Sequence, residues 1–155
     1  MAFDAFLKID GIEGESSNVK HKGEIEVLSF SWNIKQSISS VGGGGGTGKA
    51  EASDFSIVKH IDKASPQLMV AVCSGEHFRD ALFTVEEPKG ARGGGAAFLK
   101  IKLSDVLISS FQTGGGGSDQ PMDQVSLNFA KIDVAVRDSK GNWTQGTSCD
   151  FVKIE

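Results

Sequence analysis

Alternating apolar and polar side chains predict that most of this chain forms β-strands. Apolar residues take every second position over residues 3–9 and 97–103, which is the period of a strand with one buried face. A similar pattern recurs over residues 54–61 and 81–85, and in the former it places Ile61 on the buried side. The chain is therefore expected to be mainly β.

Two longer stretches, residues 23–36 and 123–138, share an irregularity. In the first, apolar side chains occupy odd positions up to Val27 and even positions thereafter. In the second, the same change of parity follows Phe129. A period-two strand changes parity only through a bulge or a sharp bend. Two bent strands favour a closed or nearly closed antiparallel β-barrel over an open sheet.

Helix signals are concentrated in residues 62–78. Ser65 offers an N-cap oxygen, Pro66 suits the first helical position, and Gly75 suits a left-handed stop. These signals predict a short flanking α-helix over residues 66–74. Apolar side chains lie on nearly all of its faces, so it must be covered on more than one side. The chain's own sheet can cover one side, and either a loop or a neighbouring subunit is expected to cover the other.

Length and charge narrow the class of protein. The chain has 155 residues, which predicts a single domain over residues 1–155. Its formal net charge of -4 and scattered basic residues argue against a nucleic-acid partner. No membrane span and no secretory signal are recognised, so synthesis in a cytosol without membrane insertion is expected. Cys73, on the apolar helix, and Cys149 are predicted to be free thiols, with Cys73 in the core.

A glycine-rich segment offers the most tempting enzymatic motif. Residues 43–50, GGGGTGKA, match a phosphate-binding loop except that Ala50 replaces the required Ser or Thr. Such a loop must also open a helix, whereas a polar loop and a strand follow Lys49. A nucleotide-binding enzyme that uses Lys49 is therefore a weak alternative, and a flexible arm over about residues 41–50 is the favoured interpretation.

Other catalytic or metal-binding patterns are not evident. His21, His60 and His77 are far apart and lack the spacing of metal ligands. No Ser-His-Asp set or pair of catalytic carboxylates stands out. We therefore predict no cofactor, no metal site and no enzymatic activity. An alternative of another class is a monomeric β-barrel that binds carbohydrate or another ligand, with Trp32 and Trp143 as stacking platforms.

Five sequence blocks together resemble a known family. They read FLKIDGIEGES, EIEVLSFSWNIKQS, DFSIVKHIDKASPQLMVAVCSGEHF, VLISSFQTGGGG and VSLNFAKIDVAV, and the glycine arm lies between the second and third. In this order they resemble the Hcp family, the tube protein of bacterial type VI secretion systems. The similarity extends over residues 1–138.

The resemblance implies a fold, an assembly and a set of partners. It implies a two-sheet β-barrel with one flanking helix, and homo-hexameric rings that stack into a hollow tube. A contractile sheath expels this tube with its tail spike protein, and effectors travel in the lumen. The implied location is the bacterial cytoplasm, followed by secretion through the apparatus without a signal peptide. The family has a structural and transport role without enzymatic activity.

Three groups of residues are assigned roles in such a tube. The polar side chains that alternate with apolar ones after the first bend are expected to face the lumen: Ser29, Ser31, Asn33 and Lys35. The arm is expected to connect stacked rings: Val41, Gly42, Gly43, Gly44, Gly45, Gly46, Thr47, Gly48 and Lys49. Part of the helix is expected to meet a neighbouring subunit: Gln67, Val70, Ala71 and Ser74.

Overall fold

The computed structural model describes residues 3–36, 50–88, 96–145 and 147–151. Most of them form strands, with one helix among the described residues. The elements are β1 (Asp4–Ile9), β2 (Ile25–Val27), β3 (Ser29–Ser31), β4 (Ile34–Gln36), β5 (Ala50–Ala52), β6 (Phe55–His60), α1 (Ala64–Ser74), β7 (His77–Glu86), β8 (Ala97–Gly114), β9 (Met122–Val136) and β10 (Ser148–Asp150).

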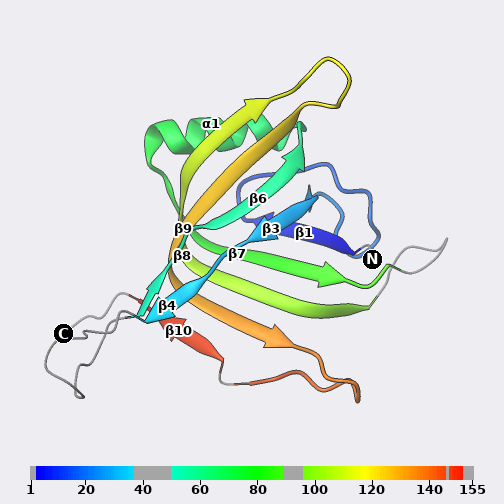
Figure 1. The fold of residues 1–155 in the computed structure, drawn as a ribbon, viewed down its shortest axis with the longest axis vertical. Coiled ribbons are helices and arrows are strands. Elements are labelled where there is room, and N and C mark those ends of the chain that lie inside the picture. Colours follow the sequence, from blue (N-terminus) through cyan, green and yellow to red (C-terminus); the bar gives the residue numbers. More distant parts are fainter. Residues whose placement is uncertain (1–2, 37–49, 89–95, 146, 152–155) are drawn as a thin grey trace, which may run out of the picture.

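The main sheet is antiparallel and curls until its two ends nearly meet (Figure 1). Its strand order is β2-β1-β7-β8-β9-β6-β3, with β10 also paired to β9. The first and last strands of this order, β2 and β3, are consecutive in sequence and are separated only by Leu28. The backbone N–H of Leu28 donates to the carbonyl oxygen of Val58 on β6 at 2.7 Å. The predicted nearly closed antiparallel barrel is thus confirmed, and the parity change after Val27 marks its seam.

The second parity change is a bend shared by β8 and β9. Both strands exchange their buried face between the pairs Ser104–Lys131 and Val106–Phe129. At this level Asp105 has φ 55°, in the left-handed region that a non-glycine residue rarely adopts. The predicted bend in β9 is therefore present, and the irregular backbone lies in β8. β8 also continues without a break to Gly114, well past residue 103 where the predicted alternation ends.

The helix begins earlier than predicted. Lys63 already has helical backbone angles, and the Asp62 Oδ1 atom accepts the N–H of Ala64 at 2.9 Å. Asp62 therefore satisfies the first turn, and the prediction of Ser65 as the N-cap is wrong. At the other end Gly75 has φ 69° and its N–H donates to the Ala71 carbonyl oxygen, which confirms the left-handed stop.

One face of α1 packs on the protein's own sheet. Leu68 and Ala71 are buried, whereas Met69 and Val70 are 48% and 56% exposed. Cys73 is exposed as well, so the prediction of a core thiol there is wrong. A helix with apolar residues on every side gives no pattern that selects the inner face.

A charged group occupies the core where an apolar one was expected. Ile61 is 47% exposed, while Lys59, on the same parity of β6, is fully buried. The Lys59 Nζ atom lies 2.8 Å from Asp62 Oδ1, 2.9 Å from Asp123 Oδ2 and 3.0 Å from Ser65 Oγ. These four residues, here called the Lys59 network, tie β6 and the start of α1 to β9. Because its charge is paired and hydrogen-bonded, burial of Lys59 is tolerated.

Candidate functional site

A polar face is formed by the strands β3, β6, β9 and β8. The four side chains predicted to line a wet surface, Ser29, Ser31, Asn33 and Lys35, are all exposed on β3, β4 and the link between them. Phe30, between Ser29 and Ser31, points to the opposite side of β3. Its ring packs against the core ring of Phe83 at a centroid distance of 4.6 Å. The exposure is thus observed, and the lumen assignment stays a prediction.

The strand register places four serines in one line across this face. Ser31 on β3 pairs with Ser56 on β6, Ser56 pairs with Ser126 on β9, and Ser126 pairs with Ser110 on β8. These four residues are here called the serine row. Adjacent strands lie about 4.8 Å apart, so the hydroxyls form a closely spaced track perpendicular to the strands.

A second row runs beside the serine row. It consists of Ser29, Val58, Gln124 and Gln112, in the same strand order. The residues of the two rows other than Ser29 line a groove of about 380 Å³. None of the described residues that line this groove is ionisable. The polar chemistry of the surface therefore comes from hydroxyl and amide groups.

A β-bulge at Ser109 increases the density of hydroxyls. The register of β8 against β9 shifts between Ile108 and Ser110, and Ser110 forms a hydrogen bond with Ser126. The Ser109 Oγ atom lies 3.2 Å from Ser126 Oγ and donates to Asp54 Oδ2 at 2.7 Å. The extra residue thus brings two neighbouring hydroxyls of β8 to one point of the row.

The polar face ends at strand edges on both sides. β7 pairs with β8 only as far as Leu107, so among the described residues the segment 108–114 has β9 as its one strand neighbour. At the opposite side, β3 pairs with β6 and with no second strand in the described part of the chain. Unpaired edge groups are available for a further strand.

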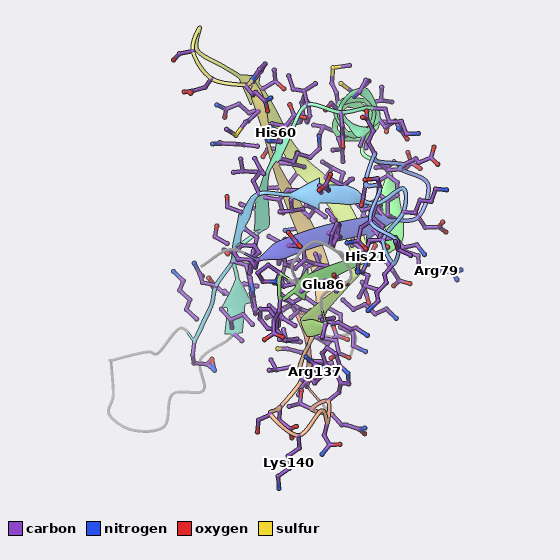
Figure 2. The ribbon with its side chains drawn as sticks, turned by 90° about the vertical axis from the view of Figure 1, so that its right-hand side faces the viewer. His21, His60, Arg79, Glu86, Arg137 and Lys140 are labelled. Carbon is purple, nitrogen blue, oxygen red and sulfur yellow. The ribbon has the colours of Figure 1, made fainter. Side chains whose placement is uncertain are left out.

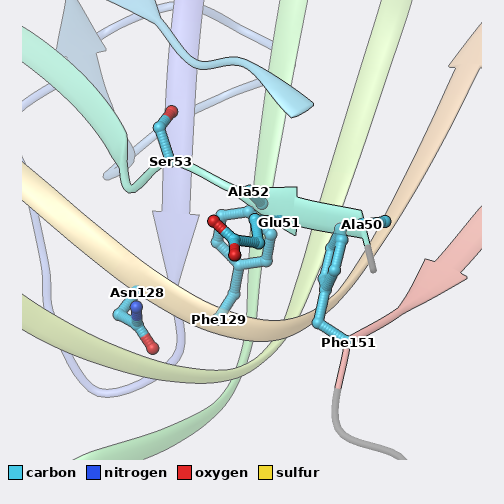
Figure 3. A pocket seen from close by; sticks show the side chains of 7 residues that line it. All are labelled: Ala50, Glu51, Ala52, Ser53, Asn128, Phe129 and Phe151. Carbon is cyan, nitrogen blue, oxygen red and sulfur yellow. The ribbon is translucent and has the colours of Figure 1, made fainter. Parts of the chain in front are cut away.

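A separate pocket of about 430 Å³ lies between β5 and β9 (Figure 3). Phe129 on β9 and Phe151 after β10 place their rings 6.0 Å apart, and Glu51 on β5 borders the same space. β5 pairs with β4 in a small sheet of its own. The glycine arm predicted between these two strands lies, up to Lys49, outside the described residues.

The proposed helix surface is only partly at the surface of the chain. Val70 and Ser74 are exposed, and Gln67 is half-buried, with its amide donating to the carbonyl oxygens of Lys63 and Glu13. Ala71, in contrast, is 2% exposed and packs inside the core. Ala71 therefore cannot meet a neighbouring subunit, and this part of the predicted interface is corrected.

The three histidines lie in different environments. The ring of His21 stacks on Phe6 and lies between Glu24, at 3.0 Å, and Glu86, at 2.5 Å (Figure 2). His77 pairs with Asp105 at 3.0 Å, and His60 is exposed on β6. Within the described ranges no three His, Cys, Asp or Glu side chains are grouped to hold a metal ion.

The alternative functions lack support in this geometry. Trp143 lies under the Lys100 ammonium group, 4.7 Å from the ring centroid, and Trp32 is partly buried against the core. Neither ring is an open stacking platform. Lys49, the basis of the nucleotide alternative, lies outside the described residues. The described part of the chain contains no helix long and apolar enough to cross a bilayer.

Comparison with known proteins gives one consistent result. A family model described as "Type VI secretion system effector, Hcp" matches residues 6–136. The protein named "Protein hcp1" from Pseudomonas aeruginosa is 43% identical over 144 residues, covering 92% of this chain and 88% of that relative.

Solved structures agree with the sequence match. The crystal structure of Hcp1 from Salmonella typhimurium has a TM-score of 0.79 and 31% identity, covering 97% of this chain and 96% of that one. The crystal structure of a type VI secretion system effector from Yersinia pestis has a TM-score of 0.76 and 32% identity, covering 96% and 98%. This chain therefore belongs to the Hcp family of type VI secretion systems.

Proposed function

We propose that this chain, a tube subunit of the type VI secretion system, assembles head to tail into six-membered rings that stack into a hollow tube. The observation that carries the proposal is the polar face, which extends from one free strand edge to another. A closed ring of identical subunits needs two different, complementary surfaces on each subunit. The free edge of β3 and the free edge of β8 over residues 108–114 are two such surfaces. Pairing the β3 edge of one copy with the β8 edge of the next would continue the sheet around the ring.

Ring closure of this kind would turn the polar face into the wall of a channel. Ser29, Ser31, Asn33 and Lys35 then face the lumen, as the sequence predicts. A conduit must bind its cargo weakly enough to release it, and exposed hydroxyls and amides with few charges suit that requirement. Small effectors carried inside the ring are the expected cargo.

Contacts between rings and with other parts of the apparatus are assigned to the remaining surfaces. The arm over residues 41–49 lies in sequence between β4 and β5, and β5 borders the pocket that contains Phe129 and Phe151. We assign the arm to ring stacking. The exposed side of α1, with Gln67, Val70 and Ser74 but without Ala71, is assigned to a neighbouring subunit.

The proposed role has no catalytic step. The chain would be made in the bacterial cytoplasm, assembled there with the tail spike protein inside the sheath, and exported by sheath contraction without a signal peptide. The family's structural role supports this pathway.

Electron microscopy and native mass measurement test the assembly. The purified protein should form rings with a mass near six times 16.4 kDa. A chain that stays monomeric at micromolar concentration would contradict the ring.

A charge exchange tests the edges directly. Ser29 and Gln112 end the second row at opposite edges, so lysine at both positions should place like charges at each junction and prevent ring formation. The matched variant, Ser29→Lys with Gln112→Glu, should form rings because the introduced charges attract. Equal assembly of the two variants would show that rings close through another surface.

A further inference from the structure

The loop between β1 and β2 is fastened to the outside of the barrel by one histidine. His21, in the loop of residues 10–24, stacks its ring on Phe6 of β1 with the ring centroids 4.4 Å apart. Its Nδ1 atom lies 3.0 Å from Glu24 Oε1, and its Nε2 atom lies 2.5 Å from Glu86 Oε2 on β7 (Figure 2). His21 thus joins the loop to two strands of the main sheet.

The residues under His21 are buried although they point away from the core. Phe6 and Glu86 alternate along their strands with the core residues Leu7 and Val85, so they lie on the outer face of the sheet. They are nevertheless only 3% and 1% exposed. Because the loop covers them, its release would bring an aromatic ring and a carboxylate into water.

The contacts of His21 require one proton more than a neutral ring carries. A carboxylate only accepts hydrogen bonds, and a neutral imidazole has one N–H, so a neutral ring donates to one glutamate but not to both. The imidazolium has two N–H groups and satisfies both carboxylates. The proton count is the same if the extra proton resides on Glu86. Without that proton, a ring lone pair faces Glu86, and the buried carboxylate loses its countercharge, which is costly.

No other described cation pairs with Glu86. The charged side chains that share the outer face, flank His21 on the loop or contact the loop from α1 are Asp4 and Lys8 on β1, Glu26 on β2, Lys100 on β8, Asp10, Glu13, Glu15, Lys20 and Lys22 on the loop, and Lys63 on α1. All of them are exposed, and Lys100 lies over the ring of Trp143. Glu86 Oε1 has no hydrogen-bond partner among the described residues, so the charge of Glu86 depends on His21.

The attachment of the loop to α1 is exposed, and the loop holds itself together only weakly. Glu13 Oε1 lies 3.1 Å from Lys63 Nζ, and both side chains are more than half exposed, so this ion pair contributes little. Backbone hydrogen bonds join Gly23 to Gly14 at 2.8 Å and to Ser16 at 2.9 Å. A short isolated hairpin is only marginally stable in water. The ordered loop therefore depends on His21.

We propose that His21 and Glu86 form a proton-operated latch, which holds residues 13–24 against the barrel when the shared proton is present and releases them when it is lost. The closed form binds one proton more than the open form, so rising pH favours opening. Imidazole groups exchange their proton near neutral pH, so the loop is expected to be closed at about pH 5 and increasingly open above about pH 8. The latch lies within one chain and does not rest on the proposed assembly.

Hydrogen exchange tests the latch on the intact protein. The N–H groups of Gly14 and Gly23 are hydrogen-bonded within the loop, so their protection factors report its ordered form and correct for the intrinsic pH dependence of exchange. Between about pH 5.5 and about pH 8.5 these factors should fall by about fivefold or more, whereas those of the central β8 amides should change by less than about twofold.

Three variants assign the effect to the shared proton. His21→Gln removes the titrating ring, so loop protection should be low at both pH values. Glu86→Gln makes the extra proton unnecessary, because its amide can donate to the Nε2 lone pair of a neutral ring, and the loop should stay protected at both. The matched control is His60→Gln, which removes an exposed histidine on β6 and should keep the pH dependence of the parent.

Three results would overturn the latch. The first is equal loop protection in the parent at both pH values, a measurement that needs no variant. The second is an unchanged pH dependence in His21→Gln, and the third is loss of the pH dependence in His60→Gln. Protection of the central β8 amides shows in each variant that the barrel is folded, so a change confined to the loop is assigned to the latch.

Discussion

The polar face and the Lys59 network show two opposite uses of polar residues on the same strands. On β6, Ser56 faces outward and Lys59 inward, and on β9, Ser126 faces outward and Asp123 inward. The outward groups are neutral and retain access to water, so each contributes little to folding. The inward groups are charged and fully buried, so each depends on its partner. Strand parity thus separates the outward, neutral polar side chains from the buried charged side chains on which stability depends.

Breaking the buried pair should have the largest effect. Lys59→Ala leaves Asp123 buried without its ammonium partner, and we expect the free energy of unfolding to fall by about 3–5 kcal/mol. Urea denaturation measures the loss. The double variant Lys59→Met with Asp123→Leu removes both charges and should lose much less. A single variant as stable as the parent would show that the pair is not coupled to folding.

The same network should make stability sensitive to acid. Burial alone would raise the pKa of Asp123, but hydrogen bonds from Ser65, Thr113 and Lys59, with the Lys59 charge, outweigh it and hold the pKa below its ordinary value. A lowered folded-state pKa gives stability that is present above the unfolded-state value of about 3.9 and is lost as pH falls through the folded-state value.

Unfolding free energy should therefore decrease at pH below about 4. The decrease should be smaller in Asp123→Asn, whose side chain does not titrate. Chemical denaturation between pH 2 and pH 7 provides the comparison. If Asp123→Asn lost as much unfolding free energy at low pH as the parent does, the pH dependence would come from other carboxyl groups.

An intermediate effect is expected at Asp105, where β8 exchanges its buried face. Its φ of 55° is unfavourable for β-branched residues, so Asp105→Val should cost about 1–2 kcal/mol in unfolding free energy. Asp105→Gly removes the steric cost and is the matched control, although it also removes the pairing with His77. Thermal unfolding of both variants should rank glycine above valine. The reverse order would indicate that the left-handed geometry is not the dominant constraint.

The smallest effect on stability is expected in the serine row. Ser126→Thr should change the unfolding free energy by less than about 0.5 kcal/mol, because the site is near the surface and threonine suits a strand. Denaturation midpoints measured beside those of the Lys59 variants would test the contrast. A loss as large as that of Lys59→Ala would remove the distinction between the two faces.

The parity of apolar residues predicted much of the fold. The change after Val27 located the barrel seam, and the change after Phe129 located the bend of β8 and β9. Both were visible because a buried face imposes a period of two on each strand. The left-handed backbone of Asp105 was not predicted, because the parity change that revealed the bend lies in β9 whereas Asp105 lies in the paired strand β8.

The sites were predicted less completely, for physical reasons. The exposure of Ser31 was predicted from its own strand, but its alignment with Ser56 and Ser126 arises only through pairing between distant segments. Lys59 was missed because a charged side chain is usually exposed, and its partner Asp123 lies 64 positions away. The serines of β6 and β9 could have been found from the polar parity of those strands.

The joint at Leu28 gives the barrel an unusual point of weakness. β2 is held by β1 and β3 is held by β6, so a proteolytic nick at this residue would leave every strand with its partner. It would nevertheless break the covalent link between β2 and β3, the first and last strands of the main sheet. After such a nick the barrel would be held closed only by non-covalent contacts, among them the hydrogen bond from Leu28 to Val58 and the packing of Phe30 against Phe83.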